Sequence, residues 1–158
     1  MKTIFRLTGM LLLSLATIHA QQPSPATTQR GTVAEAKNML DKAVEHYKSV
    51  GRTQALADFN AKKAPFGDRD LYVFCITRDL TIAANGGFPQ YVGMHGNILK
   101  DAEGKPLAKA FWDAAANKDE GSITYPMINP ISGNMERKVA FWKKIGDDIC
   151  GVGAYNPQ

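Results

Sequence analysis

The spacing of apolar residues predicts one long amphipathic helix near the start of the chain, over residues 33–50. Thr32 and Glu35 mark its first turn as a capping box, because the threonine hydroxyl can accept from the backbone three residues on while the glutamate reaches back. Gly51 is a suitable residue to end the helix. The apolar face consists of Val33, Ala36, Leu40, Val44, Tyr47 and Val50.

A shorter helix and a hairpin are expected next. Thr53 is placed to cap the helix, which ends before Pro65. Residues 70–77 are rich in β-branched and aromatic side chains, a composition typical of a buried strand. A short turn then leads into a second strand over residues 80–84.

The second half of the chain predicts a long loop, one helix and three strands. Residues 85–100 are rich in glycine and form an irregular segment, and long irregular segments in small domains tend to be functional. Pro106 suits the first position of a helix that ends near Asn117. The strands are expected at residues 122–128, 136–145 and 148–155. This order predicts an α+β domain, in which helices pack on one antiparallel sheet.

The N-terminus has the layout of a secretory signal peptide. A basic head precedes an apolar run of about a dozen residues that ends at Ala20, which is too short for a comfortable membrane span. We therefore expect a signal peptide over residues 1–20, a disordered leader over 21–31 and a single domain over 32–158. The mature protein is expected to be soluble, and periplasmic or secreted.

Charge and motifs exclude several classes of function. Removing Lys2 and Arg6 with the signal peptide lowers the formal net charge from +4 to +2, and the remaining charges alternate in sign, so nucleic-acid binding is disfavoured. His46 and His95 are far apart, and the chain has no zinc, haem or serine-hydrolase motif. We expect no metal, no cofactor and no enzymatic activity.

The two cysteines, Cys75 and Cys150, both fall in apolar runs. Export would place them where disulfides persist. They are either bridged across neighbouring strands or present as two buried thiols, because cysteine is also a common small core residue.

Four segments in this order resemble a single Cache domain of the second type, an extracytoplasmic sensory module with a PAS-like fold. They read LYVFCITRDLTIAANGG, YVGMHGNILKDAEGKPLAKAF, EGSITYPMINPISGNMERKVAFWKKI and CGVGAY. The resemblance covers residues 32–155. It implies a five-stranded antiparallel sheet, a small-molecule pocket that often takes carboxylates, and adjacent first and last strands. That adjacency favours the Cys75–Cys150 bridge.

Three positions depart from the family pattern. Asn85 stands where members commonly have histidine, Met127 where they have tryptophan, and Phe141 where they have tyrosine. These changes imply a less polar pocket than is usual for the family.

A carboxylate held away from water needs cations or N–H and O–H donors. His95 is the strongest candidate for such a donor; the alternative is that it is an exposed loop histidine. Tyr125 either contacts the ligand or packs in the core. Lys138 is either a cation in the pocket or a solvated strand residue. We take Trp112 and Trp142 as packing residues. The expected ligand-binding residues are Tyr72, Phe74, Tyr91, His95, Asn97, Tyr125, Met127, Lys138 and Phe141.

The leading hypothesis is an exported binding protein for a small organic ligand, such as a short carboxylate. It would report to a membrane receptor, sensor kinase or transporter. One alternative is a ligand-free interaction module, whose pocket is filled by its own side chains. Another is a redox protein that uses Cys75 and Cys150.

Overall fold

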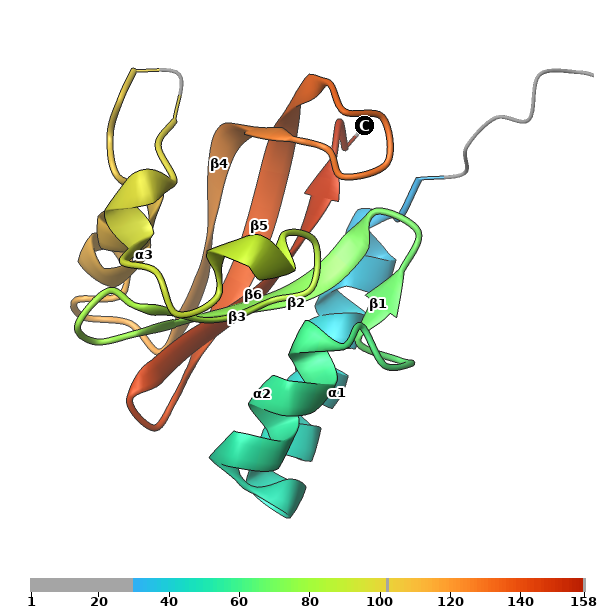
Figure 1. Cartoon of the computed structure of the whole chain (residues 1–158), viewed down its shortest axis with the longest axis vertical. Helices are drawn as coiled ribbons and strands as arrows, with labels where there is room; N and C mark the ends of the chain where they lie inside the picture. Colours follow the sequence, from blue (N-terminus) through green and yellow to red (C-terminus); the bar gives the residue numbers. More distant parts are fainter. Residues whose placement is uncertain (1–29, 102, 158) are drawn as a thin grey trace, which may run out of the picture.

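The computed structural model describes residues 30–101 and 103–157. The expected signal peptide and nearly all of the expected leader lie outside these residues. In the described part, one antiparallel sheet separates two layers, with α1 and α2 on one face and α3 with a long connecting segment on the other (Figure 1). The α+β prediction is confirmed.

The sheet has six strands in the order β1-β2-β6-β5-β4, and β3 pairs with β2 beside β1. All pairs are antiparallel. The expected sheet had five strands; the sixth is the two-residue β1. The strands are β1 (Gly67–Asp68), β2 (Leu71–Thr77), β3 (Ile82–Asn85), β4 (Glu120–Ile128), β5 (Met135–Ile145) and β6 (Asp148–Tyr155).

Helix α1 (Val33–Val50) begins with the expected capping box between Thr32 and Glu35. Helix α2 (Arg52–Asn60) follows Gly51 directly, so the expected cap at Thr53 is wrong. The two helices cover alternate residues of β2 and β6, because side chains of a strand alternate between faces. This core includes Leu71, Val73, Cys75, Cys150, Val152 and Ala154.

The opposite face is covered by α3 (Leu107–Ala114) and the segment before it. Pro106 is the cap of this helix rather than its first residue. The connecting segment contains two short turns of 3₁₀ helix, η1 (Pro89–Tyr91) and η2 (Gly96–Ile98). A Cβ at Gly96 would lie 2.2 Å from the Cβ of Ala108, so glycine lets this segment pack closely on α3.

Cys75 and Cys150 are direct partners across β2 and β6 and form a disulfide. The bridge expected from the resemblance is confirmed, and the described residues contain no unbridged cysteine. Among the same residues, no helix is both long and apolar enough to cross a lipid bilayer.

Candidate functional site

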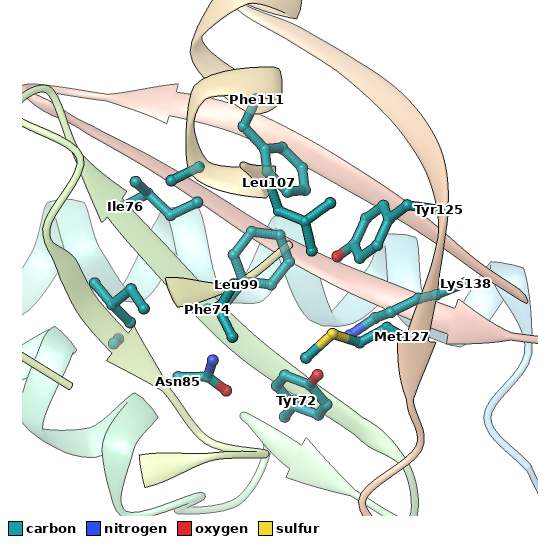
Figure 2. Close-up of a pocket in the computed structure, with 13 residues that line it drawn as sticks. Tyr72, Phe74, Ile76, Asn85, Leu99, Leu107, Phe111, Tyr125, Met127 and Lys138 are labelled. Carbon is teal, nitrogen blue, oxygen red and sulfur yellow. The ribbon is translucent and has the colours of Figure 1, made fainter. Parts of the chain in front are cut away.

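A small, partly enclosed cavity of about 30 Å³ lies between the sheet and α3 (Figure 2). Since one water needs roughly 10–15 Å³ by this measure, the space accommodates a molecule of only a few heavy atoms. Most of its wall is apolar. The lining residues are Tyr72, Phe74, Ile76, Ile82, Ala84, Asn85, Leu99, Leu107, Ala108, Phe111, Tyr125, Met127 and Lys138.

The polar end of the cavity is built from two neighbouring strands. Tyr125 of β4 and Lys138 of β5 are direct partners in the register, so their side chains project from the same face. Lys138 is only 1% exposed. A Cβ at Gly153 of β6 would lie 2.2 Å from the Cε of Lys138, so this glycine leaves the space that the lysine chain occupies.

The amine of Lys138 is surrounded by aromatic rings. Its Nζ lies 3.9 Å from the ring centre of Tyr72, 4.7 Å from that of Tyr155 and 5.8 Å from that of Phe74. No described residue forms a hydrogen bond or an ion pair with it. Burial lowers the pKa of Lys138 to about 7, and the negative charge of Asp70 opposes this shift only in part.

Two further donors border the cavity without a protein partner in the described part of the chain. The Tyr125 hydroxyl is one; burial raises its pKa well above the ordinary value and keeps it protonated. The Asn85 amide nitrogen is the other, because the Asn85 oxygen accepts from Phe88 N at 3.0 Å. The Tyr72 hydroxyl differs, since it bonds to the Tyr155 hydroxyl at 3.1 Å, which donates to a backbone carbonyl.

Lys138, Tyr125 and Asn85 therefore offer three unpartnered donor groups around one small space, and Figure 2 shows their polar ends pointing into it. Among the described residues, Trp142 Nε1 is the one side-chain polar atom that is fully buried without a partner, so these three donors face the space of the cavity rather than close-packed protein. The arrangement is suited to a small molecule with two acceptor oxygens and a short apolar part.

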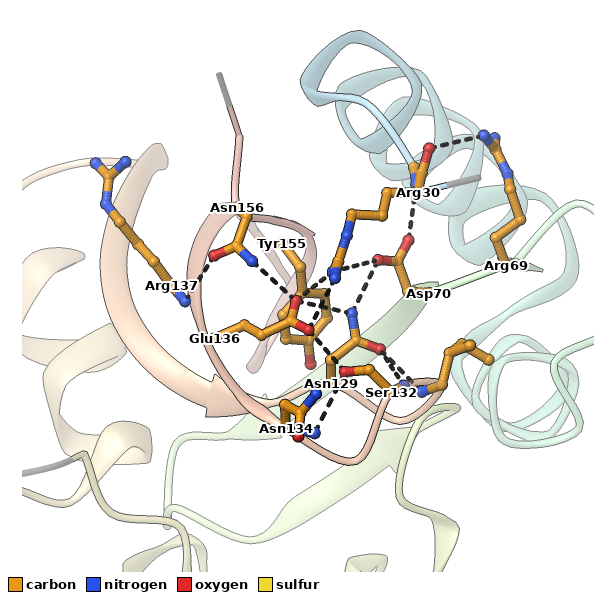
Figure 3. A network of polar contacts seen from close by, with 12 residues as sticks. Arg30, Arg69, Asp70, Asn129, Ser132, Asn134, Glu136, Arg137, Tyr155 and Asn156 are labelled. Carbon is orange, nitrogen blue, oxygen red and sulfur yellow. Dashed lines mark hydrogen bonds and ion pairs between the residues drawn. The ribbon is translucent and has the colours of Figure 1, made fainter. Parts of the chain in front are cut away.

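A network of ion pairs and hydrogen bonds lies beside this site (Figure 3). Asp70 accepts from Gly31 N at 2.7 Å and from the Asn129 amide at 3.0 Å. Glu136 pairs with Arg30, which lowers the pKa of the Glu136 carboxyl. The network ties the start of α1 to the turn between β4 and β5, and its acceptors already have partners, so its role is structural.

The glycine-rich segment does not contribute the side chains expected of it. His95 and Asn97 are exposed, and the His95 Nδ1 accepts from Asn97 N at 3.3 Å. Tyr91 is half-buried outside the cavity, with its ring 5.9 Å from that of Phe88. The backbone of this segment pairs beside β3 through Thr81 and His95, which leaves the histidine at the surface.

Side chains alternate between the two faces along β5, so Phe141 lies on the face opposite to that of Lys138 and Trp142. Its ring packs against α1, where Lys37 Nζ lies 4.8 Å from the ring centre. It borders an open groove of about 430 Å³ whose Lys143 is paired with Asp41 at 2.8 Å. Phe141 is therefore separated from the cavity by the sheet itself.

Of the expected residues, the structure brings together Tyr72, Phe74, Tyr125, Met127 and Lys138. It adds Asn85, which the sequence marked only as a departure from the family. It also adds Leu107 and Phe111, whose spacing of four residues signals one helical face. Both tryptophans are packing residues, as expected: Trp142 is buried in the core under α3, and Trp112 of α3 is partly buried against that core.

The described residues contain no cluster of three or more His, Cys, Asp or Glu that could hold a metal ion. A comparison with curated proteins found no relative of this chain. Solved structures do resemble it. A methyl-accepting chemotaxis protein from Vibrio parahaemolyticus RIMD 2210633 matches with a TM-score of 0.64 and 19% identity, over 77% of this chain and 86% of that one.

Two further structures share the fold. One is described as the "structural basis for carboxylic acid recognition by a Cache chemosensory domain" (TM-score 0.58, 16% identity, 78% of this chain and 87% of that one). The other is a periplasmic sensor domain of a chemotaxis protein (TM-score 0.58, 17% identity, 78% and 88%). The sequence matches single Cache domain 2 over residues 14–154. The chain therefore belongs to the single Cache domain 2 family.

Proposed function

We propose that this protein is an extracytoplasmic sensory domain that binds a short monocarboxylate in the cavity beneath α3. The observation that carries the proposal is the buried amine of Lys138, which has no hydrogen-bond or ion-pair partner among the described residues. A carboxylate would pair with this amine and accept from the Tyr125 hydroxyl and the Asn85 amide. Charge-assisted hydrogen bonds of this kind contribute about 1.5–3 kcal/mol each.

The small volume narrows the choice of ligand. A space of about 30 Å³ favours acids of two or three carbons over longer or aromatic ones. Met127 can enlarge it to some extent, because methionine is flexible and fills irregular gaps. The apolar wall near Phe74 and Leu107 suits a methyl or ethyl group and disfavours a second carboxylate.

Two other observations support this proposal. One of the structural neighbours is described as recognising a carboxylic acid. The signal-peptide-like N-terminus and the Cys75–Cys150 disulfide both fit an oxidising extracytoplasmic compartment. We infer that the protein reports to a membrane receptor, sensor kinase or transporter, and that it releases its ligand as the same compound that it bound.

Thermal unfolding with a series of acids tests the proposal. Formate, acetate, propionate, butyrate and the uncharged acetamide would each be added to the purified protein. A fitting acid at 100 times its dissociation constant adds about 2.7 kcal/mol to the free energy of unfolding. Acetate or propionate should stabilise most, and the effect should be absent in Lys138→Met and retained in Lys109→Met, an exposed control. Stabilisation by none of the acids would contradict the proposal.

A ligand-free interaction module is the second candidate, and the small cavity volume favours it. Its docking surface would include the apolar residues exposed near the turn between β4 and β5, Ile128, Ile131 and Met135. Replacement of Ile131 and Met135 by serine would then abolish capture of a partner, and no small acid would change the unfolding temperature.

A further inference from the structure

The surroundings of the Lys138 amine suit two roles. Its protonated form can bind an anion, and its neutral form can react as a nucleophile. A lysine attacks a carbonyl carbon only in its neutral form, and desolvation in an apolar pocket is one way in which proteins supply that form. The side chain is 1% exposed and its Nζ contacts aromatic rings rather than carboxylates. The pKa of about 7 leaves roughly half of the amine neutral at pH 7, about a thousandfold more than for a lysine with the ordinary value.

We propose that Lys138 captures a short 2-oxo acid as a reversible Schiff base. This inference rests on the proposed function, because the same cavity must accept the carboxylate. The carboxylate accepts from the Tyr125 hydroxyl and the Asn85 amide, which are the other two unpartnered donors. Figure 2 shows the Lys138 amine at the same space, which is where the oxo carbon of a bound acid would have to lie.

The chemistry needs no oxidant or further reactant. The nitrogen lone pair of Lys138 forms a bond to the oxo carbon, and the C=O double bond becomes the C–OH of a carbinolamine. This intermediate loses water, so both hydrogens of the neutral amine leave with the former carbonyl oxygen, and a C=N bond remains. Addition of water to the C=N bond reverses each step and releases the acid.

The groups around the amine set its pH dependence. The hydroxyls of Tyr72, Tyr125 and Tyr155 all have pKa values raised by burial, so they stay neutral donors. Asp70 is the negative charge that favours the protonated amine. Capture by the neutral amine therefore increases as the pH rises through about 7, whereas simple ion pairing with a carboxylate weakens.

Reductive trapping tests the inference. The purified protein would be incubated with pyruvate or glyoxylate and sodium cyanoborohydride, which leaves the Cys75–Cys150 disulfide intact, and the modified lysines would be mapped by mass spectrometry. Lys138 should carry the reduced adduct and be modified at least about 10-fold faster than the exposed Lys109, in line with its larger neutral fraction. Acetate, which has no oxo group, should slow the labelling of Lys138 and leave that of Lys109 unchanged.

A second measurement does not depend on access of the reductant. Each cycle of Schiff-base formation and hydrolysis exchanges the oxo oxygen of the acid with water. The protein should therefore accelerate loss of ¹⁸O from 2-¹⁸O-pyruvate, and Lys138→Met should not. Absence of both labelling and exchange, in a protein that acetate and pyruvate stabilise thermally, overturns the Schiff base and leaves carboxylate binding intact. If neither acid stabilises the protein and neither signal appears, the proposed function fails as well.

Discussion

The Nζ of Lys138 lies 3.9 Å from the centre of the Tyr72 ring, and both side chains are at least 98% buried. This contact holds an amine inside the protein by the negative face of a ring rather than by a carboxylate. A cation–π contact contributes up to about 2 kcal/mol when desolvated, less than the cost of burying a charge. The unliganded fold is therefore less stable than an apolar version of the same cavity, and an anionic ligand would recover the difference.

Lys138→Met should stabilise the unliganded protein by about 1–3 kcal/mol at pH 7, because it removes a buried donor that has no partner among the described residues. The pKa of Lys138 is about 7 in the fold and 10.5 ordinarily, so the unfolded chain binds more protons between these values. The stability of the natural protein should rise with pH across this window, and the advantage of the variant should shrink accordingly. Urea denaturation between about pH 7 and 10 measures both, and a destabilised variant would contradict the assignment of the amine as unpaired.

The affinity for a carboxylate should fall as the pH rises, whereas the stability of the unliganded protein should increase. The acid pairs with the protonated amine, which is present below about pH 7 and is depleted above it. Each pH unit above 7 should weaken acetate binding by about tenfold. Calorimetric titration in buffers of different ionisation enthalpy should also reveal uptake of a proton on binding near pH 8. Asn85→Ala should bind more weakly at every pH and retain the same pH slope.

Tyr125→Phe removes a donor from the cavity and retains the ring that packs against Phe111 at 5.8 Å. We expect acetate to bind about 10- to 100-fold more weakly, the equivalent of one charge-assisted hydrogen bond. Stability without ligand should change little, because the hydroxyl has no partner among the described residues. Tyr91→Phe, outside the cavity, serves as the matched control and should leave affinity unchanged. Equal affinities for the Tyr125 variant and the natural protein would remove this residue from the site.

Removal of the disulfide should weaken the fold substantially. Cys75 and Cys150 are separated by 75 residues, and closing a loop of that length restricts the unfolded chain by about 4 kcal/mol in the chain-entropy model. The double variant Cys75→Ala/Cys150→Ala should therefore unfold at lower denaturant concentration. A reducing agent should lower the stability of the natural protein to that of the variant and leave the variant itself unaffected.

Asn129→Ala tests the network beside the site (Figure 3). Its amide donates to Asp70 at 3.0 Å and to Glu136 at 3.2 Å, and the residue is 1% exposed. Loss of these donors leaves two buried carboxylates less satisfied and should cost about 2–4 kcal/mol. Asn97→Ala, at an exposed position, should change stability by less than about 0.5 kcal/mol. A similar effect of both changes would show that the network is dispensable.

The local patterns in the sequence were sufficient for most of the secondary structure. The apolar stripe and the capping box at Thr32 and Glu35 predicted α1 with its observed bounds. Strand β6 was also predicted with its observed bounds, and β2, β4 and β5 differ by one or two residues. These signals are local, because capping and periodicity depend on residues within a few positions of one another.

The membership of the cavity could be predicted only in part. Alternation sorted β5 into two faces, but period two does not state which face meets α1. In the structure α1 packs on the face that carries Val73 and Cys75. Tyr72 and Lys138 therefore line the cavity on the opposite face, whereas Phe141 lies on the α1 side. The expectation that Phe141 lines the pocket was therefore wrong, because the sequence pattern does not show which face of β5 packs on α1.

By itself, the sequence determined the elements, the α+β class, the family and the two cysteines that could bridge, because these follow from short-range patterns and their order. Only the tertiary structure decided that Lys138 is buried, since its environment comes from Gly153 and Tyr72 on other strands. Likewise, only the fold showed that His95 is exposed, because backbone pairing beside β3 directs that loop. Burial and the pKa of a side chain are properties of what surrounds it, and distant segments supply those surroundings.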